Sequence, residues 1–392
     1  MNGVVAGIAI VGLVIAAAFS IRLAWADFEF RRGTEESVAR ALRILPNNVQ
    51  YLLFRALQLD YAGLDSTAEL QRAAALSPLS SAPRLRLGLA GEARGDITTA
   101  EKWLLEAARV DRQYEPRWTL ANFYFRQNRR DDFWTWMRSA LEVSYGDRRP
   151  AFDLCWRVGK DVDEILTRGA PPQREVLAAM LAYALDLHRG DAGVIALQLA
   201  TFHDASDVPL LDAACGVLID SGLTESNDAE RAARLDRAAK LWIASGHSPA
   251  GGVWNGSFAS TPLEGGFDWR LGQGPGIAHV HMGGQGHRIE LSGAQPQTFR
   301  LLGQFVLLDP GRSYRLEWSA RTNELPETTG LVWLIGSQRF PVAASAGWKK
   351  AEAVLGAQKR LSSLELWYQR PSGQVRAEGW IELREVSLVP LQ

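Results

Sequence analysis

One helical pattern occurs twice between residues 81 and 143, with an offset of 33 residues. Small and apolar residues follow the spacing of one helix face, a turn intervenes, and a second face of the same kind follows. The sequence therefore predicts two antiparallel helical hairpins that pack closely at their small residues. The corresponding pairs are Leu87 and Leu120, Gly88 and Ala121, Gly91 and Tyr124, Gly95 and Asn128, Ala100 and Phe133, Leu104 and Met137, and Ala107 and Ala140.

A period near 33 residues with this layout resembles the tetratricopeptide repeat. Two earlier stretches, which end at Pro46 and Pro78, have the spacing of the second helix of such a repeat, and the first repeat would use the end of an N-terminal helix. The pattern departs from the family at Phe133, where a small residue is expected. Because such units bury their apolar faces against neighbours, the resemblance implies an α-solenoid over residues 27–247 that binds a protein partner in its groove.

The repeat register is lost after residue 149, but the helical pattern continues. Glycines are expected to end several of these helices, and Asp191 and either Asn227 or Asp228 to cap the starts of two of them. The expected helices cover residues 150–159, 162–168, 173–189, 192–202, 208–222 and 229–246.

The first 21 residues carry no charged side chain, and residues 4–21 are long enough to cross a bilayer as a helix. A cleaved signal peptide is the alternative, because Ala24-Trp25-Ala26 has the small-x-small form of a cleavage site. The missing positive charge before the apolar run and Arg22 beside the site oppose cleavage. We therefore expect residues 1–26 to be an uncleaved transmembrane anchor.

Composition and charge bear on nucleic-acid binding, on the source of the gene and on the state of the cysteines. A net charge of −1 gives no long-range field that would attract nucleic acid. The basic residues are nearly all arginine, which indicates a gene from a GC-rich bacterium. Cys155 and Cys215 lie in apolar helical stretches, so we expect buried free thiols rather than a disulfide framework.

The periodicity changes from helical to alternating after residues 248–252, which have the composition of a linker. Tyr314, Leu316 and Trp318 alternate with polar residues, and residues 364–369 and 375–391 follow the same rule. Gly and Pro turns separate about nine to eleven such segments. The sequence predicts an antiparallel β-sandwich over residues 253–392.

The second half contains, in this order, Val253-Trp254-Asn255-Gly256-Ser257-Phe258, Gly266-Phe267-Asp268-Trp269, residues 304–316, Gly347-Trp348 and residues 380–388. Together these segments resemble jelly-roll carbohydrate-binding modules of the galactose-binding-like superfamily, which implies a jelly-roll sandwich that binds a glycan. Many relatives hold a structural calcium with carboxylates at two places where this chain has Ala259 and Arg384-Glu385, so we predict no calcium there. We predict no other metal and no cofactor.

Glycan binding requires flat aromatic faces and planar hydrogen-bonding side chains on an exposed sheet face. If Tyr314, Leu316 and Trp318 face the core, the residues between them face outwards, and the same alternation applies to the other strands. The alternative is that the tryptophans pack under loops or against the solenoid. The candidate glycan-binding residues are Trp333, Trp367, Gln304, Glu317, Arg321 and Gln369.

The sequence contains one histidine cluster, His279, His281 and His287. Two of these imidazoles share a strand face, which is compatible with a metal site. No cysteine or well-placed carboxylate completes the set, and a half-solvated strand explains it equally. Glycoside hydrolysis needs two carboxylates across a cleft, and one sequence cannot pair them. We therefore predict no catalytic residue.

These features favour a non-enzymatic, membrane-anchored scaffold of the bacterial envelope. Its resemblance to anchored repeat proteins of this composite kind implies a role in the assembly or export of a surface polysaccharide. Arg22, Arg31 and Arg32 would keep the body in the cytoplasm by the positive-inside rule. A glycan-binding half favours the periplasmic side of the inner membrane, which is our expectation. The alternatives are a scaffold that binds only proteins, and a hydrolase with a site at the histidine cluster.

Overall fold

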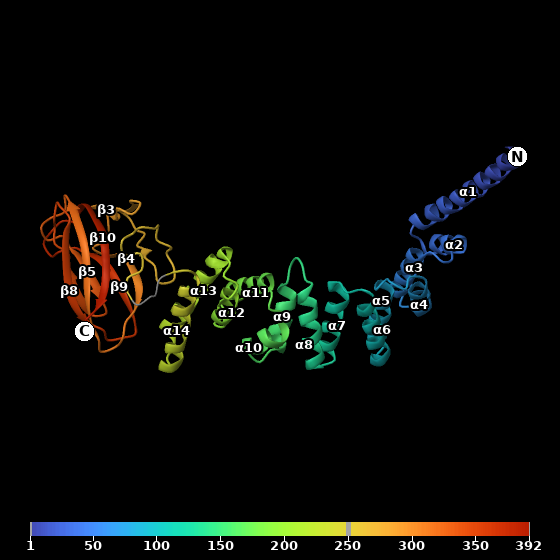
Figure 1. Ribbon diagram of the computed structural model, residues 1–392, viewed down its shortest axis with the longest axis horizontal. Coiled ribbons are helices and arrows are strands. Elements are labelled where there is room, and N and C mark those ends of the chain that lie inside the picture. The colour runs from blue at the N-terminus through green and yellow to red at the C-terminus, as the bar shows by residue number, and fades with distance from the viewer. Residues whose placement is uncertain (1, 248–251, 392) are drawn as a thin grey trace. The chain divides into compact units, whose positions relative to one another are not determined.

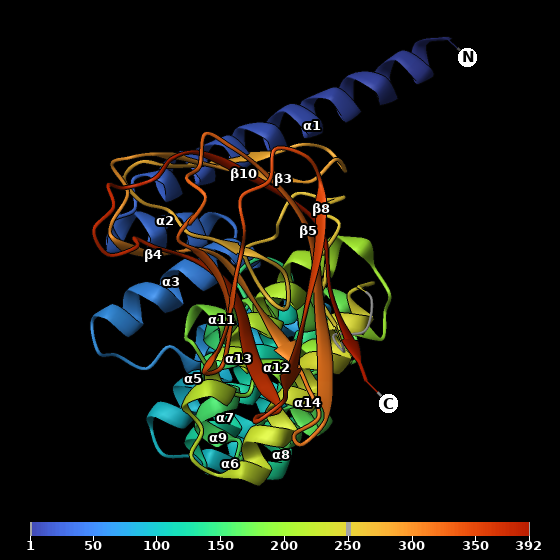
Figure 2. The same cartoon turned by 90° about the vertical axis from the view of Figure 1, so that its left-hand side faces the viewer.

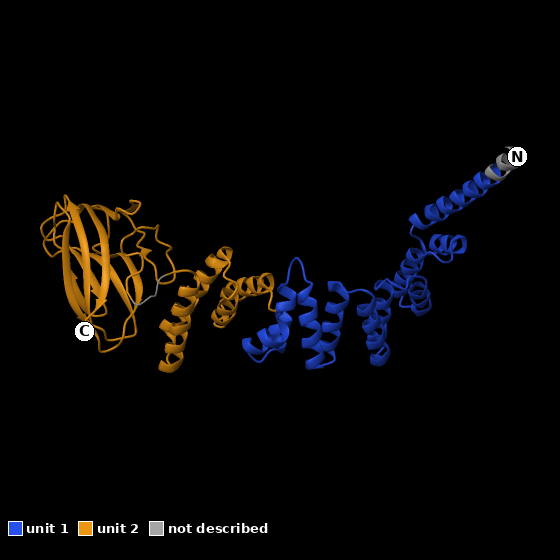
Figure 3. Cartoon of the chain, in the orientation of Figure 1, with its two compact units in different colours: residues 1–171 blue, residues 172–392 orange. Residues whose placement is uncertain are grey.

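A computed structural model describes residues 2–247 and 252–391 of the chain, with side chains from residue 10 onward (Figure 1). The chain divides into two compact units, Met1–Pro171 and Pro172–Gln392 (Figure 3). Unit 1 is helical, and unit 2 combines further helices with two antiparallel sheets. The predicted fold class, an α-solenoid followed by an antiparallel β-sandwich, is confirmed.

Unit 1 consists of successive antiparallel helical hairpins. A short π-helix, η1, ends the unit and follows α10 directly. The elements are α1 Asn2–Arg31, α2 Glu35–Ile44, α3 Val49–Tyr61, α4 Thr67–Leu76, α5 Ala82–Ala93, α6 Ile97–Val110, α7 Tyr114–Arg126, α8 Arg130–Glu142, α9 Arg149–Val158, α10 Val162–Glu164 and η1 Ile165–Gly169.

The two hairpins α5–α6 and α7–α8 confirm the repeat. Gly95 and Asn128 follow α5 and α7 with positive φ angles of 80° and 55°, a conformation that glycine and asparagine tolerate at helix ends. A Cβ atom added at Gly88 would lie 2.5 Å from Leu104, so glycine permits the close approach of α5 and α6. Phe133, the departure from the family pattern, is fully buried.

The helix α1 continues without a break into the first hairpin, as predicted (Figure 2). Ala26 is fully buried, the ring of Phe30 stacks on Tyr51 at 4.4 Å, and Glu29 pairs with Arg40 at 2.9 Å. Among the described residues, 10–31 form a helix long and apolar enough to cross a membrane, with a mean hydropathy of 1.7. A signal sequence meets the same criterion.

Unit 2 begins with four α-helices and a 3-10 turn, whose positions follow the predicted ranges closely. Of the two candidate N-caps for the last helix, Asn227 is the one used. Its Oδ1 accepts hydrogen bonds from the backbone amides of Ala229 and Glu230. The elements are α11 Arg174–Asp186, α12 Ala192–Ala200, η2 Ala205–Asp207, α13 Val208–Thr224 and α14 Asp228–Ala244.

An aromatic cluster joins α14 to the sandwich. The buried ring of Trp242 lies 3.8 Å from His247, 5.5 Å from Trp254 and 5.8 Å from Phe267. Of the predicted linker 248–252, residues 248–251 lie outside the described residues. The domain boundary expected at residue 247 stays a prediction, and the division into compact units falls instead at residue 171.

The sandwich consists of two five-stranded antiparallel sheets. Sheet A has the strand order β1-β4-β9-β6-β7, and sheet B has the order β2-β3-β10-β5-β8. One apolar core, which includes Trp269, Leu316, Trp318 and Leu366, fills the space between them. The strands are β1 Arg270–Leu271, β2 Ile277–His281, β3 His287–Ser292, β4 Thr298–Leu307, β5 Ser313–Asn323, β6 Leu331–Ile335, β7 Gln338–Pro341, β8 Lys349–Gly356, β9 Leu361–Gln369 and β10 Glu378–Pro390.

Candidate functional site

The structure does not bring the six predicted glycan-binding residues together. Trp367 and Gln369 lie on the outer face of sheet A, and Glu317 and Arg321 lie on the outer face of sheet B. The other two, Gln304 and Trp333, point into the interior. The outer faces of the two sheets must therefore be considered separately.

The prediction that Trp333 and Gln304 are exposed is wrong. Trp333 is fully buried in the core, and β6 is apolar along its whole length, so alternation could not assign its faces. Gln304 is 2% exposed and bonds to the backbone N and O of Trp254 at 2.9 Å and 3.0 Å. A β-bulge between Arg300 and Leu302 inserts one extra residue, which turns every later side chain of β4 to the opposite face.

A row of three charged side chains crosses the outer face of sheet B. Glu382 of β10 pairs in register with Arg288 of β3 and Arg321 of β5. Nε and Nη2 of Arg288 donate to Oε1 of Glu382 at 2.9 Å and 2.6 Å, and Nε of Arg321 donates to Oε2. Burial of the carboxyl would raise the pKa of Glu382, but the hydrogen bonds from both arginines prevail and lower it. Glu382 is therefore ionised and held rigidly.

Two tryptophans lie over these guanidinium groups. The ring centroid of Trp380 lies 4.5 Å from Cζ of Arg288 and 5.7 Å from Cζ of Arg321. The ring centroid of Trp348, which precedes β8, lies 4.1 Å from Cζ of Arg384 and 5.1 Å from Cζ of Arg321. Both indoles are partly exposed. The arginines fix the two rings on the sheet, since a guanidinium attracts the face of an indole.

A hollow of about 540 Å³ opens beside Trp380 on the same face. Its lining includes the carboxylates of Glu290, Glu324 and Glu378 together with Arg288. An aromatic ring beside carboxylate and guanidinium groups can stack on the C–H face of a pyranose and bind its hydroxyls with planar acceptors and donors. We call the residues Arg288, Glu290, Glu378, Trp380 and Glu382 the Trp380 site.

The sequence analysis did not select the Trp380 site, although a signal was present. Trp380, Glu382 and Arg384 alternate with the buried Ile381 and Leu383, so the outward side of β10 could be read from the sequence. The pairing of β10 with β3 could not be read, because the two strands are separated by most of the sandwich.

Glu317, a predicted site residue, lies at the other end of the sheet B face. Its carboxylate pairs with Nζ of Lys350 at 2.9 Å and with Nε of Arg315 at 2.7 Å. The hydrogen bond from Lys350, supported by Arg315, lowers the pKa of Glu317. The lysine and arginine therefore already use much of the hydrogen-bonding capacity of this carboxylate.

Trp367 and Gln369 lie in a separate polar group on sheet A. Nε1 of Trp367 donates to Glu365 at 2.8 Å, and Arg300 lies 3.5 Å from the same carboxylate. Arg339 of β7 donates to the side-chain oxygen of Gln369. The indole is partly exposed, so this face also offers an aromatic ring among planar polar groups.

The histidine cluster forms at the edge of sheet B. Nδ1 of His279 lies 3.1 Å from Nε2 of His287, and Nε2 of His279 lies 3.0 Å from the carbonyl oxygen of Gly272. Within residues 2–247 and 252–391, no group of three His, Cys, Asp or Glu side chains is placed to hold a metal ion. Burial lowers the pKa of both His279 and His287. The imidazoles of His279 and His287 are therefore neutral and hydrogen-bonded to each other.

Unit 1 contains a hollow of about 590 Å³ between α3 and α5. Leu64 and Leu89 line it and are 57% and 44% exposed. Arg94 pairs with Asp65 at 3.6 Å on its rim. The solenoid thus carries an open apolar surface bordered by both charges, which suits a peptide segment with an apolar side chain.

No family model and no curated protein matches the chain. Among solved structures, a carbohydrate-binding module described as "CBM4 structure and function" is 14% identical, with a TM-score of 0.29 over 36% of this chain and 99% of that chain. TmCBM61 in complex with β-1,4-galactotriose is 17% identical, with a TM-score of 0.22 over 31% and 88%. The C-terminal part of a TPR repeat-containing protein from Cytophaga hutchinsonii is 12% identical, with a TM-score of 0.30 over 56% and 95%. These TM-scores are too low to support an argument about the fold. The fold assignment therefore depends on the helices and strands described above.

Proposed function

We propose that this protein is a membrane-anchored, non-enzymatic scaffold of the bacterial envelope. The solenoid binds a protein partner, and the sandwich binds a glycan. The observation that carries the proposal is the Trp380 site, where a partly exposed indole is fixed beside a hollow that guanidinium and carboxylate groups line.

The Trp380 site fits a glycan better than it fits an apolar ligand or a metal. Arg288 and Arg321 are bonded to Glu382, so the site keeps a fixed arrangement of donors and acceptors before a ligand arrives. The further carboxylates Glu290 and Glu378 can accept hydrogen bonds from sugar hydroxyls. The open hollow on a sheet face suits a chain of sugars rather than a small enclosed molecule.

The α3–α5 hollow supports the second role, the binding of a protein partner. Its exposed leucines, Leu64 and Leu89, would be covered by an apolar side chain of the partner. Asp65 and Arg94 on the rim would fix the orientation of the segment through its charges.

The long apolar α1 supports attachment to a membrane, and glycan binding supports a body in the periplasm. Together with the solenoid, these features favour a role in the assembly or export of a surface polysaccharide. The arginines that follow the span favour the opposite orientation, so protease protection of right-side-out vesicles is the direct measurement of topology.

The glycan proposal is tested with the full chain in detergent or nanodiscs on an array of bacterial surface polysaccharides. Trp380→Ala should lower the affinity for the bound glycan about tenfold or more, because it removes the stacking surface. Trp367→Ala is the matched variant on sheet A and should leave binding unchanged. If Trp367→Ala abolishes binding and Trp380→Ala does not, the assignment to sheet B is wrong. If no polysaccharide binds, a scaffold that binds only proteins is favoured.

A further inference from the structure

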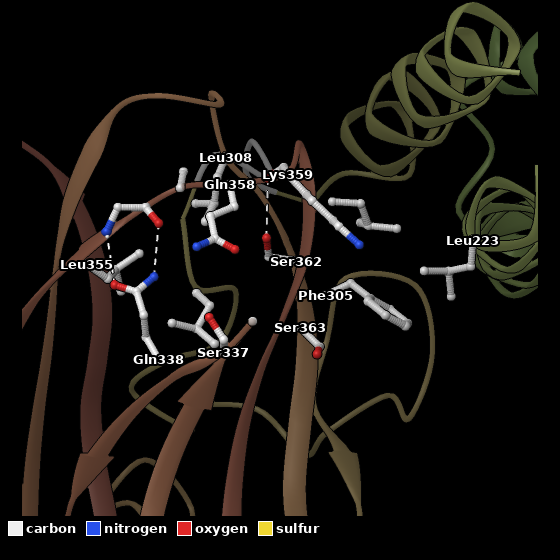
Figure 4. A pocket seen from close by; sticks show the side chains of 15 residues that line it. Leu223, Phe305, Leu308, Ser337, Gln338, Leu355, Gln358, Lys359, Ser362 and Ser363 are labelled. Carbon is white, nitrogen blue, oxygen red and sulfur yellow. Dashed lines mark hydrogen bonds between the residues drawn. The ribbon is translucent and has the colours of Figure 1, made fainter. Parts of the chain in front are cut away.

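A second hollow, of about 340 Å³, opens at one end of the sandwich, away from the Trp380 site (Figure 4). Its apolar lining includes Leu308, Leu355 and the ring of Phe305. The bulge in β4 turns Phe305 outwards. Arg270, which does not line the hollow, lies over this ring with Cζ 4.6 Å from the centroid and so holds it in place. Leu223 of α13, in the same compact unit, faces the hollow from the side.

One wall of the hollow is fixed by the side chain of Gln338. Its Nε2 donates to the carbonyl oxygen of Gly356 at 2.9 Å, and its Oε1 accepts from the amide of Gly356 at 3.2 Å. These two bonds join the end of β8 to the start of β7 across the two sheets. The hollow is therefore preformed rather than a gap between mobile loops.

Five other polar side chains line the same space: Ser337, Gln358, Lys359, Ser362 and Ser363. Oγ of Ser362 donates to the carbonyl oxygen of Lys359 at 3.3 Å. The other four side chains have no hydrogen-bond or ion-pair partner among the residues that the structure describes. Phe305 and Ser363 are register partners on neighbouring strands, and Figure 4 shows Gln358 and Ser337 on the opposite side of the hollow, towards Gln338. The hollow thus combines one aromatic ring, three hydroxyls, two carboxamides and one ammonium group, and the carboxamide of Gln338 and the hydroxyl of Ser362 already bond to the backbone.

We propose that this hollow binds a single residue of an acidic sugar. The C–H face of the pyranose stacks on Phe305, and its hydroxyls bond to Ser337, Ser363 and Gln358. The carboxylate of the sugar pairs with Lys359. A volume of about 340 Å³ lies at the small end of ligand pockets, so the site takes one residue and not a chain.

The experiment titrates the full chain with methyl glucuronide and methyl galacturonide by ligand-detected NMR, with methyl glucoside and hexanoate as comparison ligands. At least one acidic sugar should bind. Methyl glucoside should bind about fivefold more weakly, which is the contribution of an exposed ion pair. Binding of hexanoate in preference to both acidic sugars would overturn the proposal, and so would the absence of binding by either acidic sugar.

Variants separate this site from the Trp380 site. Lys359→Gln should lower the affinity for the acidic sugar about fivefold and leave that for methyl glucoside unchanged. Ser363→Trp should fill the hollow and abolish binding, whereas Ser372→Trp, on an exposed loop, should have no effect. Trp380→Ala should leave this binding intact whether or not the Trp380 site binds a glycan. Unchanged binding in Ser363→Trp would place the ligand elsewhere and refute the proposal.

Discussion

His279 and His287 share a hydrogen bond, with Nδ1 of His279 lying 3.1 Å from Nε2 of His287. The carbonyl oxygen of Gly272 can only accept, so Nε2 of His279 carries a proton and its Nδ1 accepts from His287. Nδ1 of His287 is then a buried acceptor without a partner among the described residues. Burial, together with the neighbouring His279 and His281, lowers the pKa of His287 to about 4.

This pair predicts that the sandwich loses stability as the pH falls from 6.5 towards 4. The unfolded His287 takes up a proton near pH 6.5 and the folded one only near 4, so the unfolded state binds more protons in this window. The stabilisation is complete above 6.5 and is lost below 4, and it amounts to at most about 3 kcal/mol. Urea unfolding at a series of pH values measures it.

His287→Phe should flatten that part of the pH profile, because the phenyl ring can stack on Phe258 as the imidazole does but cannot titrate. The exposed His203 provides the control, and His203→Gln should leave the profile unchanged. If wild type and His287→Phe have parallel profiles between pH 7 and 4, the histidine pair does not cause the dependence.

The carboxylate of Glu382 is expected to stabilise sheet B because it pairs with arginines on both neighbouring strands. Glu382→Gln would leave Arg288 and Arg321 without their counter-ion. Their side chains are 29% and 34% exposed and remain partly hydrated, so we expect a loss of about 1–3 kcal/mol in the free energy of unfolding. Glu352→Gln, whose side chain is 65% exposed, should change it by less than about 0.5 kcal/mol. Equal effects of the two substitutions would contradict the prediction.

Sequence periodicity predicted most of the fold, because each element follows one rule along its length. Glu317 and Arg321 face outwards on β5, as the alternation with Leu316 and Trp318 predicts. The rule failed where the backbone departs from regular geometry. The bulge after Arg300 shifted the faces of β4, and nothing in the local sequence marks an extra residue there.

The candidate site was harder to predict than the fold, because it depends on which strands are neighbours. Arg288, Arg321 and Glu382 come from three strands and meet only through the order β3-β10-β5. Any single sequence contains many Arg and Glu residues with outward positions, and alternation assigns a face but not a neighbour. Trp333 illustrates the other failure, since an apolar strand gives no alternation to read.

Gly88 is expected to set the distance between α5 and α6. In Gly88→Ala, the new Cβ would lie 2.5 Å from Cγ and Cδ2 of the fully buried Leu104, so the helices would have to separate. We expect a local loss of about 1–3 kcal/mol. Gly216→Ala, in α13, meets no atom within 4 Å and should stabilise its helix by about 0.5–1 kcal/mol. Amide hydrogen exchange of peptides from each hairpin measures both, and unchanged exchange in α5 and α6 would refute the close approach.

Gly266 is expected to be required for the contact between α14 and the sandwich. It has a φ of +53°, and an added Cβ would lie 2.3 Å from Cζ3 of Trp242. Gly266→Ala should lower the free energy of unfolding of unit 2 by about 2–4 kcal/mol, from backbone strain and from the displaced indole. Gly283→Ala is the matched control, because it has a φ of +57° and meets no atom, so only the strain remains. Equal losses in the two variants would show that the Trp242 contact contributes nothing.

The buried Ala26 predicts that the N-terminal helix is retained. The helix α1 passes without interruption through Ala24-Trp25-Ala26, and Nε of Arg22 donates to the carbonyl oxygen of Ile44 at 3.0 Å. Cleavage after Ala26 would remove both contacts from the first hairpin. We therefore expect the protein in the membrane fraction to have its full-length mass.

Ala26→Asp should expose the first hairpin to protease, since it buries an unpaired charge. Phe28→Ser, at a 57% exposed position of the same helix, should not. A mature protein that begins at Asp27 would show that the first hairpin forms without these contacts.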